Sequence, residues 1–356
     1  MAGYAHTATC MEQKPLLLPV LTSSLPLEKP LAFLEKDTLT QDAYHRPTSG
    51  LMGYVPDVLV PYAELMRLHK PAGYYAFYFP HLFGLLYGAI LVRPSPEDLF
   101  WSHMVIAAGC LFLRGAACTY NDTVDAPFDR QVARCRNRPI ARGAVSTTGG
   151  LIFMILQSGV CLAFLAMLPR ACLVPAALYT ATMALYPLCK RFTNYPQVVL
   201  GFSFSLGQLV GAASVGLDVF NVTSSDEIAG MACLYLSNVA NTVVYDTVYA
   251  HQDLKDDLKA GVMSMAVAVQ GCAKPVLFLL ATAEVVLLAI AGYCLQLTAG
   301  YFILGAYGTA VLLGYMLLSV RLDVPEDCWK WFKLSIYLSG MTLSGGLLSD
   351  YLLVLL

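Results

Sequence analysis

A row of polar side chains closes an apolar segment that is long enough to cross a bilayer. It reads Asn121-Asp122-Thr123-Val124-Asp125-Ala126-Pro127-Phe128-Asp129. A carboxylate near the centre of a bilayer costs roughly 3 kcal/mol even on insertion scales, so acids in this setting usually face a cavity, an ion or a pathway. On a helix, Asn121, Asp125 and Asp129 recur every fourth position and point to one side. Because hard divalent cations such as Mg²⁺ take oxygen ligands, the row predicts a cation site.

A second acidic cluster, Asp253-Leu254-Lys255-Asp256-Asp257, follows another apolar segment about 130 residues later. Asp246 lies seven residues before Asp253, and Asp257 four after it, so one helical face can carry all three. Two acids spaced by four hold a cation only if a ligand supplies further oxygens, as phosphates do for Mg²⁺. The two clusters together predict a two-sided site for metal and diphosphate. We expect His251 to be a helix-end polar residue rather than a ligand.

Basic residues accompany both clusters. Arg114 lies two helical turns before Asn121, and is either a structural salt-bridge partner or an anion clamp over the acidic cavity. The segment Arg134-Cys135-Arg136-Asn137-Arg138-Pro139 is a basic loop suited to phosphate. Lys190 and Arg191 suit phosphate oxygens equally well, the first as a point charge and the second as a bidentate fork. Without the acids, these charges would indicate only the cytosolic side of a membrane.

The composition is that of an integral membrane protein. Of 356 residues, 57% are hydrophobic and 13% are charged, against about 25% charged in soluble domains. The net charge of −2 excludes a generally basic nucleic-acid binder. The eleven cysteines form no CxxC pair, so we interpret them as apolar residues rather than disulfides or zinc ligands.

Apolar windows of about 20 residues predict an all-α membrane protein with about nine transmembrane helices. The expected spans are 72–92, 99–120, 151–169, 171–189, 197–217, 228–247, 275–296, 298–319 and 333–355. Residues 58–66 are expected to form a short interfacial helix before the first span.

The distribution of Lys and Arg predicts the orientation. Loops after even-numbered spans carry thirteen: Arg130, Arg134, Arg136, Arg138, Arg142, Lys190, Arg191, Lys255, Lys259, Lys274, Arg321, Lys330 and Lys333. The opposite loops carry two, Arg93 and Arg170. By the positive-inside rule, both acidic clusters then face the cytosol. Asn221-Val222-Thr223 is a possible glycosylation site on the luminal side.

Residues 1–60 differ from the rest, and we expect a disordered or weakly structured cytosolic tail before a polytopic domain over 61–356. The first 50 residues hold one Arg against five acids, unlike a mitochondrial transit peptide, and no apolar run suits a signal peptide. This favours the endoplasmic reticulum, with the mitochondrial inner membrane as the alternative.

Three segments resemble the signature regions of the UbiA superfamily of intramembrane prenyltransferases. They are "RGAACTYNDTVDAPFDRQVARCRNRPIARG", "YPLCKRFTNYPQVVLG" and "YDTVYAHQDLKDDLKAGVMS", and "MRLHKPAGYYAFYFP" is similar to that family's entry to its first span. The likeness runs from about Met66 to the C-terminus. It is greatest to 4-hydroxybenzoate polyprenyltransferases and fungal meroterpenoid prenyltransferases.

The resemblance implies a nine-helix bundle whose cavity opens to the cytosol and to lipid. By position it implies two Mg²⁺ ions bridging the donor diphosphate, with ligands Asn121, Asp122, Asp125, Asp129, Asp253 and Asp257. It places Arg114, Lys190, Arg191 and the Arg138 loop near the diphosphate or the acceptor. As our hypothesis, Asp246 orients the acceptor or takes up its proton. Tyr120 and the Trp-free "GAASVG" of Gly211–Gly216 depart from hydroxybenzoate enzymes, and predict a different acceptor pocket.

These features predict Mg²⁺-dependent transfer of an isoprenyl group, expected to be farnesyl, to a phenolic or polyketide-derived aromatic acceptor in meroterpenoid metabolism. The near alternative is a 4-hydroxybenzoate polyprenyltransferase of ubiquinone biosynthesis, and the distant one a cation-coupled transporter. The expected partners are the isoprenyl diphosphate, the aromatic acceptor and the bilayer, with no nucleic acid and no obligate protein partner. The aromatic run of the first span either lines the cavity or simply packs, and we favour packing; its members are Tyr74, Tyr75, Phe77, Tyr78 and Phe79.

Overall fold

The computed structural model describes residues 44–355, with the exception of the Val354 side chain, and these residues form helices and turns without a strand. The prediction of an all-α membrane protein is confirmed. The first 43 residues of the predicted tail lie outside the described part. Three short helical segments precede the bundle: η1 (Gly50–Tyr54), η2 (Asp57–Leu59) and α1 (Val60–Leu65). The last of these falls within the predicted interfacial segment.

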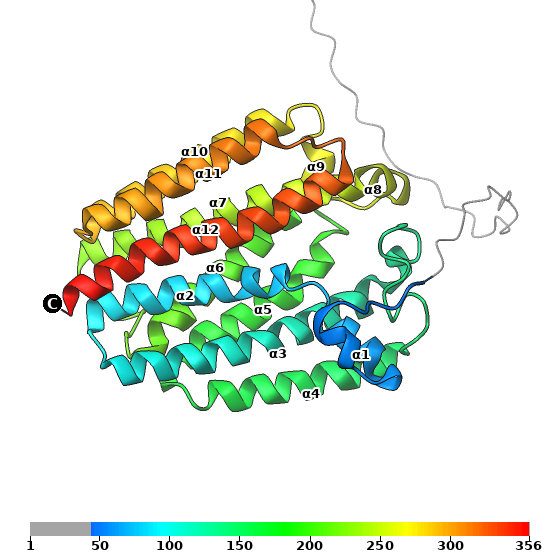
Figure 1. Cartoon of the computed structure of the whole chain (residues 1–356), viewed down its shortest axis with the longest axis horizontal. Helices are drawn as coiled ribbons and strands as arrows, with labels where there is room; N and C mark the ends of the chain where they lie inside the picture. The colour runs from blue at the N-terminus through cyan, green and yellow to red at the C-terminus, as the bar shows by residue number, and fades with distance from the viewer. Residues whose placement is uncertain (1–43, 356) are drawn as a thin grey trace, which may run out of the picture. The chain divides into compact units, whose positions relative to one another are not determined.

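Within the described residues, eight helices are long and apolar enough to cross a membrane, and they lie side by side in Figure 1. They are α2 (Ala72–Val92), α3 (Pro96–Asp129), α4 (Thr147–Leu165), η3 with α5 (Arg170–Cys189), α6 (Pro196–Ser214), α7 (Ser225–Ala250), α10 (Ala273–Cys294) and η5 with α11 (Tyr301–Ser319). Each coincides with one of the first eight predicted spans.

The ninth predicted span corresponds to α12 (Pro325–Val354), a 30-residue helix that packs along α2. This helix is not among the eight that their length and composition mark as membrane-spanning. Its polar side chains are turned into the bundle, since Ser335, Ser339 and Asp350 are all buried. The Asp350 carboxylate accepts a hydrogen bond from the backbone N–H of Thr298, 2.6 Å away, just before η5 begins.

Serine residues fix the start of three long helices. Ser95, Ser146 and Ser224 are N-caps of α3, α4 and α7, and their hydroxyl oxygens accept hydrogen bonds from backbone N–H groups in the first turn. The first turns of α3 and α7 also carry acids, which the positive end of a helix dipole stabilises. These caps therefore set where each of the three helices begins.

The helices α2 and α6 cross in backbone contact at the centre of the bundle. A Cβ atom at Gly84 would lie 1.8 Å from the carbonyl oxygen of Gln208, and one at Gly211 would lie 1.9 Å from that of His81. Small residues permit this approach, which strengthens packing between helices in a membrane. Polar pairs add to it elsewhere in the bundle: the amide of Asn238 donates to the Ser205 hydroxyl, 2.9 Å away.

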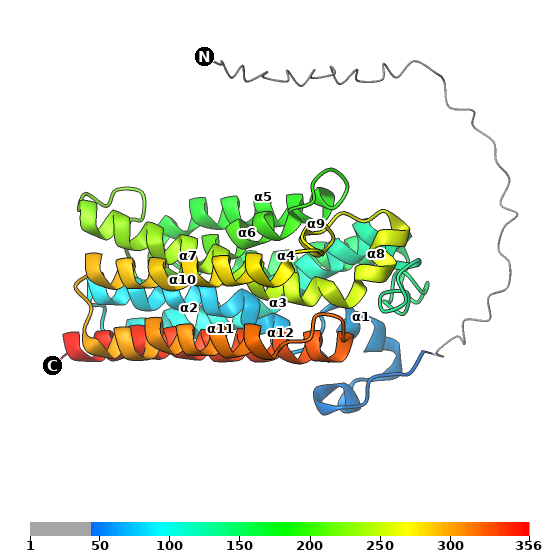
Figure 2. The same ribbon diagram turned by 90° about the horizontal axis from the view of Figure 1, so that it is seen from above.

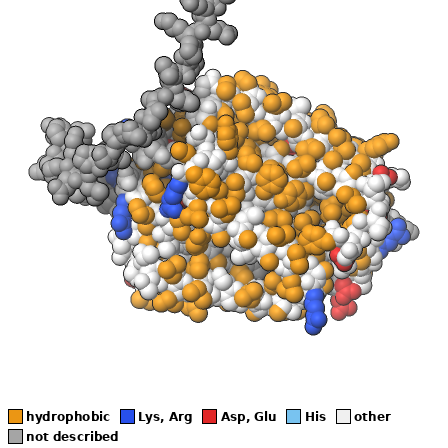
Figure 3. Space-filling model, turned by 180° about the vertical axis from the view of Figure 1, so that it is seen from behind, with side chains coloured by type: hydrophobic (Ala, Val, Ile, Leu, Met, Phe, Trp, Pro, Cys, Tyr) orange, Lys and Arg blue, Asp and Glu red, His pale blue; other side chains and the backbone are white. Residues whose placement is uncertain are grey.

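One end of the bundle gathers short elements from distant parts of the sequence. In Figures 1 and 2, α1, α8 (Leu254–Ala260) and the connection after α3 all lie at this end. The face in Figure 3 is covered mainly by hydrophobic side chains, and the few charged ones lie near its edges. An apolar flank with polar ends is what a bilayer requires.

Candidate active site

The first acidic row lies at the end of α3 that joins the cluster of short elements. The helix continues to Asp129 instead of ending near residue 120, so all the acids of the row are helical. Asp122, Asp125 and Asp129 are only 1%, 3% and 6% exposed. Buried carboxylates are costly unless they are paired or bind a cation, so their partners define the site.

Two guanidinium groups hold Asp122 and Asp129. Arg67, which follows α1, donates to the Asp122 carboxylate at 2.5 Å. Arg138, from the connection after α3, donates to Asp122 at 3.2 Å and to Asp129 at 2.8 Å. The predicted basic loop therefore folds back onto the acids that precede it.

The third acid, Asp125, has its partner in the connection between α5 and α6. The ammonium of Lys190 lies 2.8 Å from one Asp125 oxygen, and the guanidinium of Arg191 lies 4.0 Å from the other. Arg191 also donates to the Val124 carbonyl at 2.9 Å. Burial would lower the pKa of Lys190, but Tyr186 and Asp125 oppose this effect and raise the pKa above its ordinary value. Lys190 is therefore a permanent cation.

The second acidic cluster meets the same basic loop. Arg134 forms a bidentate pair with Asp253, with nitrogen–oxygen distances of 2.9 and 2.5 Å. It also donates to the Tyr249 hydroxyl at 2.6 Å, with its guanidinium carbon 4.9 Å from the centre of that ring. One loop thus bridges two clusters that are about 130 residues apart in sequence.

The remaining acids of the second cluster lie in the same field of charge. Burial raises the pKa of Asp257 to about 7, and Asp253 adds to the shift while Lys190 and Arg134 oppose it. Asp246 lies near the end of α7, one helical turn before Tyr249, to whose hydroxyl Arg134 donates. His251 donates from Nδ1 to the Thr247 carbonyl at 2.7 Å, the arrangement of a helix-end residue.

Arg114 points to the segment between α1 and α2. Its guanidinium donates to the carbonyl oxygens of Arg67 at 3.2 Å and Lys70 at 2.6 Å. Both of these contacts are to backbone, and Arg114 forms no ion pair with the described residues. The anion clamp stays a prediction. Its hydrogen bonds hold the segment 67–70 over the acidic row, and any direct catalytic role stays a prediction.

That segment contributes two cations that were not predicted as site residues, Arg67 and Lys70. Burial, together with the positive charges of Arg134, Arg67 and Arg138, lowers the pKa of Lys70 to about 8. The Lys70 ammonium lies 5.9 Å from the centre of the Trp329 ring. A lysine among three arginines is a strong anion-binding arrangement. The run Arg67-Leu68-His69-Lys70 before the first span was its signal in the sequence.

The aromatic run of the first span packs against neighbouring helices. Phe77 and Phe79 are buried, and the Phe77 ring lies 4.7 Å from that of Phe204. The Tyr74 hydroxyl donates to the Ala107 carbonyl at 2.9 Å, while the Tyr75 ring meets that of Tyr337 at 4.9 Å. The favoured interpretation, packing, accounts for these residues.

The oxygen atoms of α3 fit a hard cation. The side-chain oxygen Oδ1 of Asn121 and Oδ2 of Asp122 are buried without a hydrogen-bond partner among the described residues. No group of three His, Cys, Asp or Glu side chains in the described part of the chain is arranged to hold a metal by itself. This agrees with a site in which each cluster supplies a few oxygens and a bound phosphate supplies others. The ten described cysteines are all free.

Comparison with known proteins identifies relatives of this arrangement. The model of the UbiA prenyltransferase family matches residues 78–340. The mitochondrial 4-hydroxybenzoate polyprenyltransferase of Saccharomyces cerevisiae is 36% identical over 300 residues, which cover 84% of this chain and 78% of that protein. The prenyltransferase stbC of Stachybotrys bisbyi is 35% identical over 315 residues, covering 87% and 93%.

Solved structures share the fold. A UbiA homolog from Aeropyrum pernix K1, in its apo form, aligns with a TM-score of 0.60 at 22% identity and covers 78% of this chain and 97% of its own. A homolog from Archaeoglobus fulgidus bound to GPP and Mg²⁺ aligns with a TM-score of 0.58 at 17% identity, covering 80% and 99%.

Proposed function

Since the chain belongs to the UbiA prenyltransferase family, we propose that it transfers an isoprenyl group, expected to be farnesyl, from its diphosphate to a phenolic or polyketide-derived aromatic acceptor. The observation that carries this proposal is the convergence of two acidic clusters, the first of them buried, and six basic side chains at one end of the bundle. A transporter is set aside, because the chain belongs to a family of transferases.

Two Mg²⁺ ions fit the oxygen-rich part of this site, where they would neutralise the leaving diphosphate. Their proposed ligands are Asn121, Asp122, Asp125, Asp129, Asp253 and Asp257. The buried, unpartnered oxygens of Asn121 and Asp122 support this assignment, as does the Mg²⁺ bound together with GPP in the Archaeoglobus fulgidus homolog. The cations now paired with Asp122, Asp125 and Asp253 would then be available to phosphate oxygens.

The basic residues bind the diphosphate in this proposal. Lys190, Arg191 and Arg138 reach it from two connections, and Arg134, Arg67 and Lys70 complete a ring of positive charge. Fixed cations stabilise the negative charge that develops on the diphosphate as the allylic C–O bond breaks, without reorganising during the reaction. Arg114 contributes by holding the backbone that carries Arg67 and Lys70.

The acceptor ring attacks the allylic carbon, a ring C–C bond forms, and the ring proton must then leave. Asp246 is the group proposed to take that proton or to orient the acceptor hydroxyl. It lies on α7 one turn from Tyr249, which accepts a hydrogen bond from Arg134 of the basic loop. Apolar walls around the site keep water from the allylic carbon.

A second candidate is a 4-hydroxybenzoate polyprenyltransferase of ubiquinone biosynthesis. The 36% identity to the yeast enzyme of that name favours it. Two fungal relatives favour the first candidate, a prenyltransferase of meroterpenoid metabolism. They are stbC and ascA of Acremonium egyptiacum, which is 43% identical over 225 residues. We propose that the protein lies in the endoplasmic reticulum membrane with its active site facing the cytosol. For the second candidate function, the expected location is the mitochondrial inner membrane.

One experiment tests the reaction and separates the two candidates. Microsomes that contain the protein are incubated with geranyl, farnesyl or geranylgeranyl diphosphate and a panel of phenolic acids, and the products are identified by mass spectrometry. We expect a farnesylated product, and its loss in Asp125→Asn and Asp253→Asn but not in Asp226→Asn, which changes an exposed acid at the start of α7. Near-normal transfer in Asp125→Asn or Asp253→Asn would contradict the metal assignment. Rescue of a ubiquinone-deficient yeast would favour the second candidate.

A further inference from the structure

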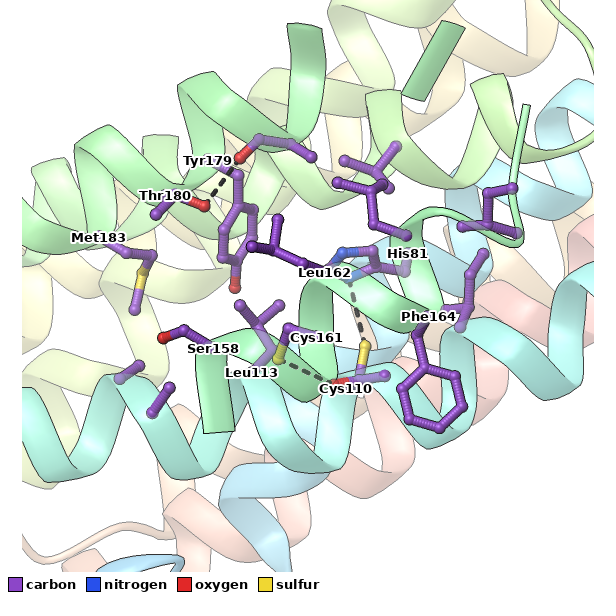
Figure 4. A pocket seen from close by; sticks show the side chains of 18 of the residues that line it. His81, Cys110, Leu113, Ser158, Cys161, Leu162, Phe164, Tyr179, Thr180 and Met183 are labelled. Carbon is purple, nitrogen blue, oxygen red and sulfur yellow. Dashed lines mark hydrogen bonds between the residues drawn. The ribbon is translucent and has the colours of Figure 1, made fainter. Parts of the chain in front are cut away.

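A cavity of about 460 Å³ lies between α3, α4 and α5, with one residue each from α2 and α6 in its wall (Figure 4). Its inner wall is buried and includes His81, Cys110 and Tyr179. Its outer rim includes Leu162 on α4 and Thr180 on α5, which are exposed. The cavity therefore opens sideways, through the flank of the bundle that faces lipid.

The cavity runs along α3 toward the acidic site. The α3 residues in its wall extend from Val105 to Tyr120, and fifteen residues of helix span about 22 Å. Tyr120 directly precedes Asn121 of the acidic row. On α5, Met183 lines the cavity two helical turns before Lys190, whose ammonium pairs with Asp125 at 2.8 Å. The long, apolar cavity thus shares two walls with the active site.

One buried polar group in its wall has no partner. Tyr179 is 2% exposed, and its hydroxyl has no hydrogen-bond partner among the described residues. Figure 4 shows this hydroxyl turned into the cavity, toward Ser158 and Leu113. The Ser158 hydroxyl is itself bonded to the Met154 carbonyl at 2.9 Å. A buried hydroxyl without a partner costs about 1–3 kcal/mol, so a ligand that accepts its hydrogen bond is stabilised there.

We propose that this cavity is a membrane-facing binding site for a prenylated phenol, with the apolar chain along α3 and the phenolic oxygen hydrogen-bonded to Tyr179. The lateral opening requires a ligand that dissolves in lipid, and Tyr179 requires one that carries an oxygen. A hydrocarbon chain alone lacks that oxygen, and the charged end of the isoprenyl diphosphate belongs to the basic site. The identity of the ligand rests on the proposed function, whose product combines a phenol with an apolar chain.

Binding to the full-length protein in nanodiscs tests the proposal without turnover. The probes are tritiated 2-farnesylphenol and tritiated farnesane, which has the same chain and no oxygen. We expect Tyr179→Phe to weaken binding of the phenol about fivefold, as the loss of one hydrogen bond predicts, and to leave farnesane unchanged. Ala176→Leu, which fills the cavity, should weaken both probes. Ala177→Leu, at the next and exposed position of α5, should weaken neither.

Equal affinity of wild type and Tyr179→Phe for the phenol would overturn the proposal, as would equal effects of the two Leu substitutions. A competition assay compares phospholipid and sterol with unlabelled 2-farnesylphenol as displacers of the tritiated phenol. If either lipid displaces the phenol at a lower concentration, the cavity is a site for bilayer lipid and the proposal is also overturned. Transfer assays on the same preparations keep the two hypotheses apart. If the protein binds 2-farnesylphenol as expected but transfers no isoprenyl group, the proposed function is contradicted and the proposed binding site is not.

Discussion

Lys190 and Asp125 form a buried ion pair that joins the α5–α6 connection to α3, and the pair makes a residue-scale prediction. Lys190→Met should lower the rate of diphosphate release by about tenfold to a hundredfold, because a charge-assisted hydrogen bond contributes about 1.5–3 kcal/mol. Lys190→Arg, which keeps the charge, should retain more activity. The rate is measured with saturating farnesyl diphosphate and acceptor. Lys259→Met, at an exposed position of α8, is the control and should behave as wild type; similar losses in both variants would count against the assignment.

Lys70 predicts a pH dependence of donor binding. Its pKa is lowered to about 8, so the ammonium is charged below pH 8 and loses its charge as the pH rises through that value. The KM for the isoprenyl diphosphate should therefore rise roughly fivefold between pH 7 and 9, equivalent to one lost favourable contact. In Lys70→Arg the guanidinium remains charged, and the KM should stay nearly constant. An identical rise in wild type and Lys70→Arg would assign the effect to another group.

Some site residues could be predicted from the sequence and others could not, and the two groups are positioned in different ways. The acids of α3 follow from helical spacing and from the cost of charge in a membrane, both of which are local. Arg67 reaches Asp122 across 55 positions of sequence. It does so from a backbone with a positive φ of 58°, in a segment that Arg114 holds by a hydrogen bond to the Arg67 carbonyl. No spacing rule places such a segment over a particular helix.

At the scale of elements, the connection after α3 behaves as a cap that binds the second acidic cluster. Arg134→Gln and Asp253→Asn should each speed backbone hydrogen exchange over residues 130–146, because each removes the bidentate pair that holds this run of turns. The double variant should exchange little faster than either single one, since the two side chains form one interaction. Exchange is followed by mass spectrometry in nanodiscs, with Arg136→Gln as the control within the same loop. Additive effects of the two substitutions would show that the cap is held elsewhere.

The crossing of α2 and α6 predicts a large effect from a single methyl group. In Gly84→Ala the new Cβ would meet the backbone of α6 at 1.8 Å, and backbone cannot move aside as a flexible side chain can. Overpacking of this kind costs about 1–3 kcal/mol, so the midpoint of thermal unfolding in detergent should fall. Gly159→Ala on α4 is the control, because nothing lies within 4 Å of the added Cβ. Equal midpoints for Gly84→Ala and wild type would show that the two helices are less closely packed.

The helices themselves were largely predictable, and the exceptions have a common cause. Apolar windows located α2 within its observed bounds, but ended α3 near residue 120, where the acids begin. The helix continues because Arg138 and Lys190 neutralise those acids from other connections. Likewise α12 forms at its expected place although Ser335, Ser339 and Asp350 reduce its apolarity, because the bundle buries them. Tertiary partners allow polar residues in helices that hydropathy alone would end.

For the molecule as a whole, the two acidic clusters lie at one end because each follows a helix that runs in the same direction through the bundle. Spans α3 and α7 are separated by three intervening spans, so both end on the same side. The Asn221 loop lies between α6 and α7, and the residues around Cys272 lie between α9 (Met265–Ala268) and α10. The two loops should therefore be on opposite sides of the membrane, with Cys272 on the side of the acids.

Labelling of sealed microsomes tests this orientation. In a Cys10→Ser background, a membrane-impermeant maleimide should label exposed Cys272 from outside, and Cys272→Ser should abolish this signal. Adding Asn221→Cys to the double variant should restore labelling only after the vesicles are permeabilised, because Asn221 is exposed on the expected luminal side. The thirteen-to-two distribution of Lys and Arg is the physical reason for this expectation. Labelling of Asn221→Cys in sealed vesicles, together with no labelling of Cys272 in the Cys10→Ser protein, would show that the diphosphate site faces the lumen and would contradict a cytosolic donor supply.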